Sequence, residues 1–263
     1  MAEPSVLDRI VDAVRGRLDS TSEAGDLADR AARVRDTSPP RSLRDALRFE
    51  GPSIIAECKK ASPSAGLLRA DFDPAALAAA YQRAGASAIS VVTEPDFFQG
   101  RLEWLAAVRS AVDLPVLRKD FIIDERQLRE AAALGADAVL LIQRILPPDR
   151  LAELVGAARE LGLETLVEIF ADEDPAATVA SGTEIIGVNA RDLATFVTRL
   201  DVVETMAAEL PDDRVRVAES GITCHDDIAR LTAAGYDAFL IGEHLVRAED
   251  SERALRRLLG DVS

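Results

Sequence analysis

The sequence is poor in the residues that most metal, redox and disulfide sites require. Its 263 residues include two cysteines and two histidines. Cys58 and Cys224 lie far apart in no CxxC or Cys/His cluster, so we expect two reduced thiols and no zinc or iron–sulfur centre. His225 and His244 stand where helices are expected to begin, without acidic or cysteine partners at ligand spacing, which favours surface or capping roles. The sequence therefore predicts chemistry without a metal.

Long apolar runs and a surplus of basic charge are missing too. No stretch approaches the roughly 20 apolar residues that span a membrane. The N-terminal residues, MAEPSVLDRIVDAVRGRLD, carry charges where a secretory signal would be apolar, so we expect a cytoplasmic protein without a membrane partner. With 31 Lys and Arg against 46 Asp and Glu, the net charge is −15. This charge argues against a nucleic-acid partner, and an anionic ligand would need a local cationic pocket. No protein partner is identifiable.

Lysine is scarce, and its placement is informative. Lys59, Lys60 and Lys119 are the only lysines, while the other 28 basic residues are arginine. An ammonium group loses its proton when its surroundings shift its pKa, whereas a guanidinium effectively does not. We therefore predict that lysines transfer protons in this protein. The alternative is chance in an arginine-preferring composition.

From about residue 52 onward the chain repeats a β-branched run, a polar or Gly-rich loop and an amphipathic segment. Gly85, Gly135 and Gly235 end three of these segments, where they suit a left-handed C-terminal helix cap. Eight units of about 25 residues predict a closed (β/α)8 TIM barrel, with a doubly wound open sheet as the alternative. The strands are expected to begin near Ser53, Ala88, Pro115, Ala138, Glu164, Glu184, Arg214 and Ala238.

Residues 1–50 lie outside this repeat and are predicted to form an N-terminal helical extension packed on a catalytic barrel of residues 51–263. Val6, Ile10 and Val14 have helical apolar spacing, and SLRDALRF offers a further short helix. The extension has two possible positions. It either plugs the bottom of the barrel or covers its active-site end.

Polar residues interrupt several apolar runs near the ends of the expected strands, which is where barrel enzymes build active sites. Because alternate strand residues share a face, Glu57 and Lys59 are expected inside the barrel, with Cys58 toward the helices. Packed carboxylates and ammonium groups shift one another's pKa values, so we expect a lysine that donates a proton near neutral pH and a glutamate that accepts one. The candidates are Glu57, Lys59, Lys119, Glu168, Asn189, Arg191, Glu219 and Ser220.

The last two strands and the aromatic residues point to a phosphorylated ligand. Gly221 and Gly242 follow the seventh and eighth strands, where barrels often bind phosphate through backbone N–H groups. A tight turn would explain either glycine alone. Ser62 adds a hydroxyl from the first loop, and Phe98 with Phe121 predicts an apolar wall.

Together these segments resemble the indole-3-glycerol-phosphate synthase family, (β/α)8 enzymes of tryptophan biosynthesis. The resemblance runs from about SLRDALRF to the end of the eighth strand through IIAECKKASPS, SVVTEPDFFQG, LRKDFII, ADAVLLI, LVEIF, IGVNARDL, VAESGI and FLIGEHLV. It implies ring closure of 1-(2-carboxyphenylamino)-1-deoxyribulose 5-phosphate, a phosphorylated small molecule, with loss of carbon dioxide and water. No cofactor is implied.

The resemblance implies a role for each matched residue. Lys119 is similar to the general acid that protonates the substrate carbonyl as the aromatic ring attacks. Lys59 resembles the residue that orients the substrate carboxylate and acts as an acid in dehydration. Glu168 resembles a general base or electrostatic partner, with Glu57 in the same proton network. The residues that match holders of the anthranilate portion and the catalytic groups are Asn189, Glu219 and Ser220.

Binding positions follow from the same resemblance. Phosphate contacts are implied for Ser62, Gly221, Gly242 and the backbone at Glu243, whose carboxylate would repel phosphate. Pocket-lining positions are implied for Phe98, Phe121, Arg191 and Leu193. Two other functions stay open: a Schiff-base aldolase with Lys119 as nucleophile, and a barrel that binds a phosphorylated metabolite without catalysis.

Overall fold

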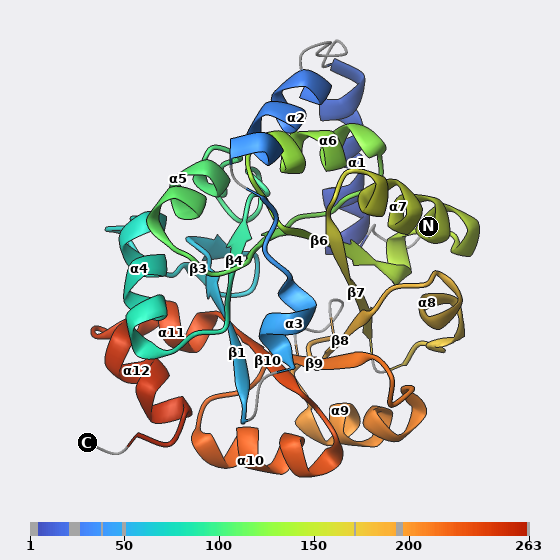
Figure 1. The fold of residues 1–263 in the computed structure, drawn as a ribbon. Coiled ribbons are helices and arrows are strands. Elements are labelled where there is room, and N and C mark those ends of the chain that lie inside the picture. Colours follow the sequence, from blue (N-terminus) through green and yellow to red (C-terminus); the bar gives the residue numbers. More distant parts are fainter. Residues whose placement is uncertain are drawn as a thin grey trace.

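The structure is a computed structural model that describes residues 5–20, 27–37, 39–48, 51–170, 172–192 and 197–261. Eight parallel strands form a closed barrel, and Figure 1 shows them surrounded by helices. The barrel strands are β1 (Ser53–Cys58), β4 (Ala88–Val92), β5 (Val116–Lys119), β6 (Ala138–Ile142), β7 (Glu164–Phe170), β8 (Ile185–Asn189), β9 (Val215–Glu219) and β10 (Ala238–Ile241).

The order of hydrogen-bonded strands around the barrel is β1-β10-β9-β8-β7-β6-β5-β4, and β4 pairs with β1 to close it. Every strand begins within one residue of its expected start. The prediction of a (β/α)8 TIM barrel is therefore confirmed, and the open-sheet alternative is wrong.

Helices follow the strands around the outside of the barrel. They are α4 (Pro74–Ala84), α5 (Trp104–Ala111), α6 (Glu125–Ala133), α7 (Pro148–Glu160), α8 (Ala176–Ala180), α9 (Leu200–Met206), α10 (His225–Ala234), α11 (Glu243–Arg247) and α12 (Ser251–Leu258). Two 3-10 turns, η1 (Gln143–Ile145) and η2 (Ala207–Glu209), and an antiparallel pair, β2 (Ala61–Ser62) with β3 (Gly66–Leu67), lie in the connections. No helix in these described ranges is long and apolar enough to cross a membrane.

Local sequence signals explain where the helices begin and end. The Asp73 carboxylate accepts hydrogen bonds from the N–H groups of Ala75 and Ala76 and so caps the start of α4. Gly85 and Gly235 are left-handed C-terminal caps with φ of 98° and 108°, and Gly135 has φ of 81° just after α6. The predicted glycine caps are confirmed, because only glycine adopts these angles without strain.

Alternation along the strands separates two hydrophobic cores. Ile54, Ala56 and Cys58 of β1 pack outward against the helices, whereas Ile55 belongs to the cluster inside the barrel. Cys58 is buried and Cys224 is exposed, and both are free thiols. The predicted inward and outward faces of β1 are confirmed.

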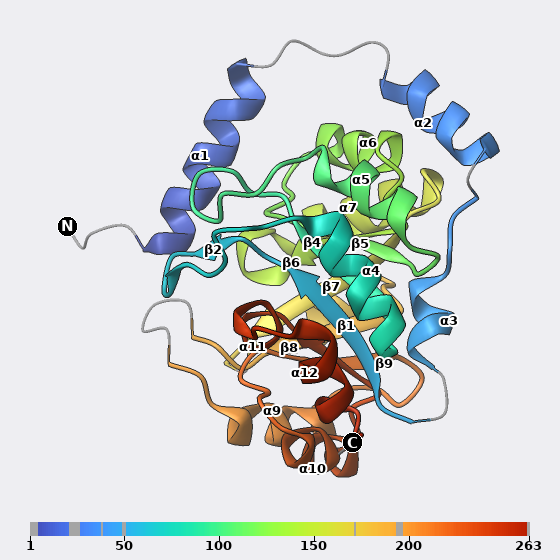
Figure 2. The same cartoon turned by 90° about the vertical axis from the view of Figure 1, so that its left-hand side faces the viewer.

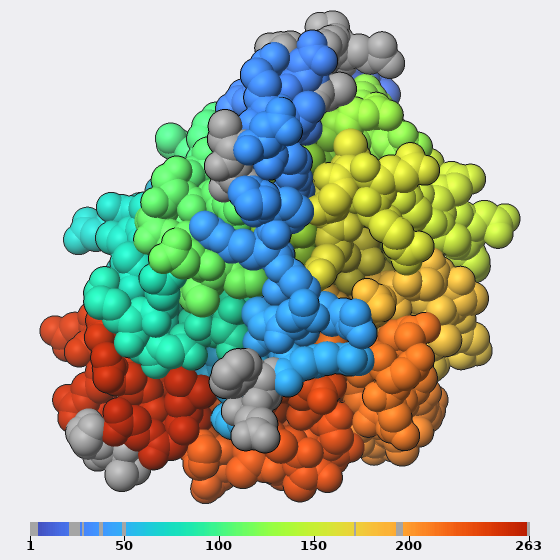
Figure 3. Space-filling view, viewed as in Figure 1, coloured from blue at the N-terminus to red at the C-terminus, as the bar shows by residue number. Residues whose placement is uncertain are grey.

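The N-terminal segment contributes to both ends of the barrel. Its helices are α1 (Val6–Ser20), α2 (Leu27–Thr37) and α3 (Leu43–Leu47), and Figure 2 shows α1 and α3 on opposite sides of the strands. Leu43 and Leu47 of α3 are buried with the inner core, and Ser42 Oγ donates to Glu164 at the start of β7. Figure 3 shows the segment through α2 and α3 running across this face. α3 therefore plugs the bottom, while α1 covers the other end, so both predicted positions are occupied.

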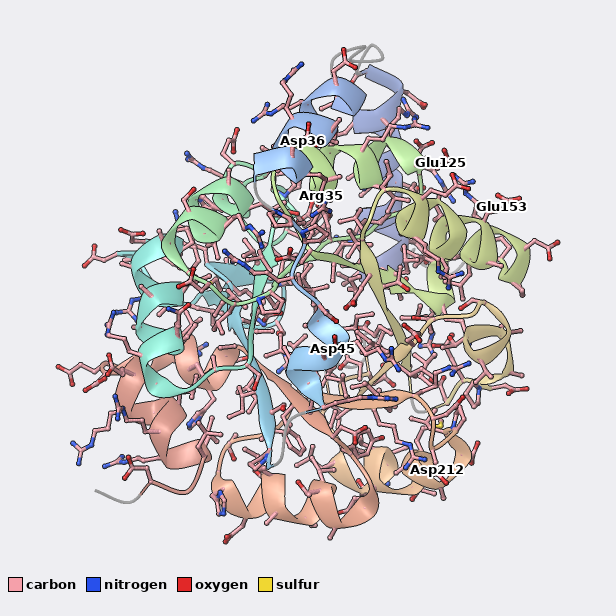
Figure 4. All side chains as sticks on the ribbon, viewed as in Figure 1. Arg35, Asp36, Asp45, Glu125, Glu153 and Asp212 are labelled. Atoms are coloured by element: carbon pink, nitrogen blue, oxygen red, sulfur yellow. The ribbon has the colours of Figure 1, made fainter. Side chains whose placement is uncertain are left out.

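The excess negative charge lies largely on the outside of the molecule. Figure 4 shows Glu153 and Asp212 pointing away from the barrel, and their side chains are 62% and 100% exposed. By contrast, Lys59 and Lys119 are only 16% and 17% exposed. The two lysines predicted to transfer protons are therefore shielded from the acidic surface.

Candidate active site

A cavity of about 420 Å³ lies at the carboxyl ends of the barrel strands, beneath α1. Its volume suits a small ligand. Leu193 lies outside the described residues. The other sequence-predicted site residues all line this cavity: Glu57, Lys59, Ser62, Phe98, Lys119, Phe121, Glu168, Asn189, Arg191, Glu219, Ser220, Gly221, Gly242 and Glu243.

Lys119, at the end of β5, lies between two acidic side chains from strands across the barrel. Its Nζ atom is 3.0 Å from Oε2 of Glu168 on β7 and 3.5 Å from Oε2 of Glu219 on β9. The glutamate side chains are 3% and 1% exposed. Each of the three residues occupies an inward-facing position of its strand. Because the barrel is closed, inward-facing side chains point toward its axis, and the three groups therefore meet there.

The pKa of Lys119 is shifted upward. Burial alone would favour the neutral amine, but the surrounding acidic side chains, Glu168 first and then Glu219 and Glu57, outweigh that effect and raise the pKa. The shift is therefore opposite to the one that burial alone would produce. Lys119 is an ammonium group throughout the neutral range.

Glu219 is shifted toward its protonated form. Burial and the neighbouring carboxylate of Glu168 raise its pKa well above the ordinary value, despite the opposing charge of Lys119. Within the described structure, Oε1 of Glu219 has no hydrogen-bond partner.

Glu57, on β1, holds the second lysine. Oε1 of Glu57 lies 2.6 Å from Nζ of Lys59, and the glutamate side chain is 4% exposed. Burial would raise the pKa of Glu57, but the charges of Lys59 and Lys119 outweigh it and lower the pKa. Glu57 is therefore ionised and fixes the Lys59 ammonium at the cavity wall.

Phe98 and Phe121 form the apolar wall of the cavity. Their ring centroids are 6.0 Å apart, with the rings tilted by 38°. Glu94, which is fully buried, accepts hydrogen bonds from the backbone N–H groups of Asp96, Phe97 and Phe98. This carboxylate fixes the loop that carries Phe98.

The opposite wall combines backbone turns with hydroxyl and guanidinium groups. Ser220 and Gly221 follow β9 with φ of 71° and 80°, and Gly242 immediately precedes α11. Arg191 donates to Ser64 Oγ at 2.9 Å, and its guanidinium lies 3.3 Å from the Glu243 carboxylate. These donors can recognise an anion from several sides.

The Glu243 carboxylate also lies 3.2 Å from the guanidinium of Arg247, which sequence analysis missed. Each lysine and arginine lining the described cavity is thus paired with a carboxylate, as Lys59 is with Glu57 and Lys119 with Glu168. The sequence analysis expects a local cationic pocket for an anionic ligand, because the net charge of the protein is −15. The cavity instead contains basic and acidic side chains in pairs. Pairing reduces the free energy of holding charged groups away from water.

The described residues contain no group of three or more His, Cys, Asp or Glu side chains arranged to hold a metal ion. His225 bonds through Nδ1 to the carbonyl of Leu258, in keeping with a packing or capping role. His244 was expected to have a surface or capping role, but it lines the cavity.

The sequence offered a cover over the active-site end only as one of two positions for the N-terminal extension, and it identified none of the residues that form this cover. Val6, Leu7 and Ile10 of α1 line the cavity, and Arg17 of the same helix pairs with Glu94 and Asp96. The apolar spacing of α1 indicates that one face of the helix is buried. It does not indicate what that face covers, because the apolar stripe of a helix has the same sequence pattern whether it packs over a ligand cavity or over a hydrophobic core.

Comparisons with known proteins agree on one family. A family model described as indole-3-glycerol phosphate synthase matches residues 7–258. Relatives of that name from Nocardioides sp. and Rhodospirillum rubrum are 49% and 45% identical, with 97% of this chain aligned to 98% and 99% of theirs. A third from Geobacillus kaustophilus is 52% identical over 84% of this chain and 85% of its own.

Solved structures show the same fold at low identity. A 3-hexulose-6-phosphate synthase aligns with a TM-score of 0.64 and 18% identity, over 80% of this chain and 100% of its own. A mutant tryptophan synthase alpha-subunit from the hyperthermophile Pyrococcus furiosus aligns with a TM-score of 0.61 and 15% identity, over 81% of this chain and 99% of its own. These likenesses concern the barrel fold alone.

Proposed function

The chain belongs to the indole-3-glycerol phosphate synthase family, and we propose that its cavity performs the family's ring closure with Lys119 as the general acid. The family reaction is a carboxy-lyase step of tryptophan biosynthesis. It converts 1-(2-carboxyphenylamino)-1-deoxyribulose 5-phosphate to the indole product, carbon dioxide and water. The observation that supports Lys119 most directly is its largely enclosed ammonium group, 3.0 Å from Glu168.

Two ends of the cavity suit two ends of this substrate. The backbone at Gly221, Gly242 and Glu243, with the Ser62 hydroxyl, offers hydrogen-bond donors to the phosphate. The Phe98 and Phe121 rings offer an apolar surface to the aromatic ring on the other side. A substrate bound in this way spans the barrel mouth, with its carbonyl group over the lysine and glutamate cluster.

In the first step the aromatic carbon that bears the carboxylate attacks the sugar carbonyl carbon, and a carbon–carbon bond forms. Lys119 transfers a proton to the carbonyl oxygen, which becomes a hydroxyl group. Its raised pKa suits this task, because the developing alkoxide is more basic than an amine and the transfer is downhill. Carbon dioxide then leaves, and its bonding electrons restore the aromatic ring.

In the second step that hydroxyl group leaves as water. Lys59 donates a proton to it, and Glu168 removes a proton as the double bond of the indole forms. Glu57 orients Lys59 through the 2.6 Å pair. Asn189, Glu219 and Ser220 hold the substrate and the charged groups, and Arg191 and Leu193 complete the pocket. One carbon dioxide and one water are released in total.

The Schiff-base alternative makes a different demand on Lys119. A nucleophilic lysine must be a neutral amine, and a raised pKa opposes this. Incubation with the substrate and borohydride followed by mass spectrometry separates the two mechanisms. Our proposal predicts no adduct on Lys119, whereas a covalent adduct there would contradict it.

The direct test of the function is the appearance of indole absorbance and fluorescence when purified protein meets the carboxyphenylamino substrate. A non-catalytic binding barrel would bind the compound and leave its spectrum unchanged. We further propose that the protein is cytoplasmic and acts on this small phosphorylated substrate without a membrane, nucleic-acid or cofactor requirement. The net charge of −15 supports the exclusion of nucleic acid.

A further inference from the structure

Gly187 is a glycine whose backbone conformation does not require one. It lies in β8, and its φ is not among the positive values found at nine other glycines of the described structure. Its register partner on β7 is Glu168, and two residues further along β8 Asn189 pairs with Glu219 of β9. Gly187 therefore stands inside the barrel between the strands that carry two of the active-site carboxyl groups.

The side chain of Glu219 occupies the space that a residue other than glycine would need. A Cβ atom built on Gly187 would overlap Oε1 of Glu219 and lie 3.2 Å from its Cδ and 3.3 Å from Cδ1 of Leu166. Glu219 is 1% exposed and lines the cavity, so its carboxyl group can make room for an added methyl group only by leaving its present site.

We propose that Gly187 is a positioning residue for the ring-closure reaction. Its missing side chain lets the Glu219 carboxyl group fold across β8 to its place beside Glu168 and 3.5 Å from Nζ of Lys119. This inference rests on the role of Glu219 proposed above. It adds a residue that touches neither the substrate nor Lys119 and that acts through Glu219.

The same arrangement occurs a second time in the barrel. A Cβ atom built on Gly242, at the C-terminal end of β10, would overlap Oε1 of Glu57 and lie 3.0 Å from its Cδ. Glu57 belongs to β1, the neighbour of β10, as Glu219 belongs to β9, the neighbour of β8. Two buried carboxyl groups thus lie where a neighbouring glycine leaves room. Gly242 is also a phosphate candidate, so Gly187 gives the cleaner test.

A methyl group on Gly187 would move the carboxyl group rather than the strand. The backbone of β8 is hydrogen-bonded to β7 and β9 on both sides, and its outward residues Ile186 and Val188 are fully buried. The end of the Glu219 side chain therefore moves more easily than the backbone of β8. Displacement by about 1 Å in a catalytic cluster lowers turnover by about 10²-fold.

The first experiment is a kinetic cycle with the carboxyphenylamino substrate. Gly187→Ala should lower kcat by about 10²-fold with little change in KM. Glu219→Asp withdraws the carboxyl group by one methylene, so adding Gly187→Ala to it should lower kcat much less than it lowers that of the wild type. Gly156→Ala, on α7 with nothing within 4 Å of the added methyl, is the matched control. Wild-type kcat in Gly187→Ala, or equal losses in both backgrounds, would overturn the proposal.

The second experiment needs no activity and covers a variant that folds poorly. Gly187→Ala should lower the urea midpoint of the wild type, whereas in a Glu219→Ala background the same change should leave the midpoint nearly unaltered. An equal loss in both backgrounds would place the clash at Leu166 and overturn the proposal. Wild-type turnover in Glu219→Ala alone would instead remove Glu219 from the mechanism, which separates that failure from a failure of the Gly187 inference.

Discussion

Nζ of Lys119 lies 3.0 Å from Oε2 of Glu168, and both side chains are largely enclosed at the mouth of the barrel. The two residues are 49 positions apart in sequence and come from β5 and β7. Their pairing gives the cavity a protonated donor next to an acceptor. A dehydrating, decarboxylating ring closure needs both, and their contributions can be separated by substitution.

Glu168→Gln should lower kcat by about 10²–10⁴-fold, because the amide cannot remove a proton, and should change KM much less. The measurement is steady-state indole formation across substrate concentrations. Glu219→Gln serves as the comparison, since an amide replaces a carboxyl group whose raised pKa favours the neutral form. We expect it to lose less than about tenfold. A Glu168→Gln enzyme with a wild-type rate and pH profile would exclude the glutamate as base.

The stability of the protein should depend on pH through Glu219. Its pKa is raised in the folded protein, so its contribution to stability is fully present below the unfolded pKa of about 4.3 and is lost as pH rises toward the folded pKa. Glu219→Gln lacks this titration. The free energy of unfolding of the variant minus that of the wild type should therefore increase from pH 5 upward, by at most about 1.4 kcal/mol per pH unit.

Urea unfolding of both proteins between pH 5 and 8 measures this difference. Glu57, whose lowered pKa stabilises the folded protein above about 4.3 and less as pH falls, is present in both and cancels approximately in the comparison. Parallel pH dependences would mean that Glu219 is ionised in the folded protein.

Glu243 should compete with phosphate for the two arginines that hold it. Glu243→Gln releases the guanidinium groups of Arg191 and Arg247, at 3.3 and 3.2 Å, for an incoming anion. Partly exposed pairs of this kind contribute up to about 1 kcal/mol, so inhibition by inorganic phosphate should strengthen by about two- to fivefold. If Glu243 instead held Arg191 in its binding position, the inhibition constant would rise, contrary to this prediction.

Most of the fold was predictable because its signals are local. The strand starts, the inward face of β1 and the caps at Gly85 and Gly235 follow from two-residue alternation and from backbone angles that glycine favours. Barrel closure then brings Glu57, Lys119 and Glu168 into one cavity, since each ends its strand on the inward side.

The remaining features depend on contacts between distant segments. The position of α1 over the site, the pairing of Arg247 with Glu243 and the room that Gly187 leaves for Glu219 require coordinates. The direction of the Lys119 pKa shift could not be predicted, because sequence suggests burial but does not show that the surrounding acidic residues outweigh it.

The central claim is that Lys119 delivers a proton, and the turnover of Lys119→Arg tests it most directly. The replacement keeps a positive charge beside Glu168 and Glu219 but does not readily release a proton. The variant should bind the carboxyphenylamino substrate with a similar dissociation constant and form indole at a rate about 10²–10⁴-fold below the wild type in single-turnover fluorescence. A rate within a few fold of the wild type would contradict the claim.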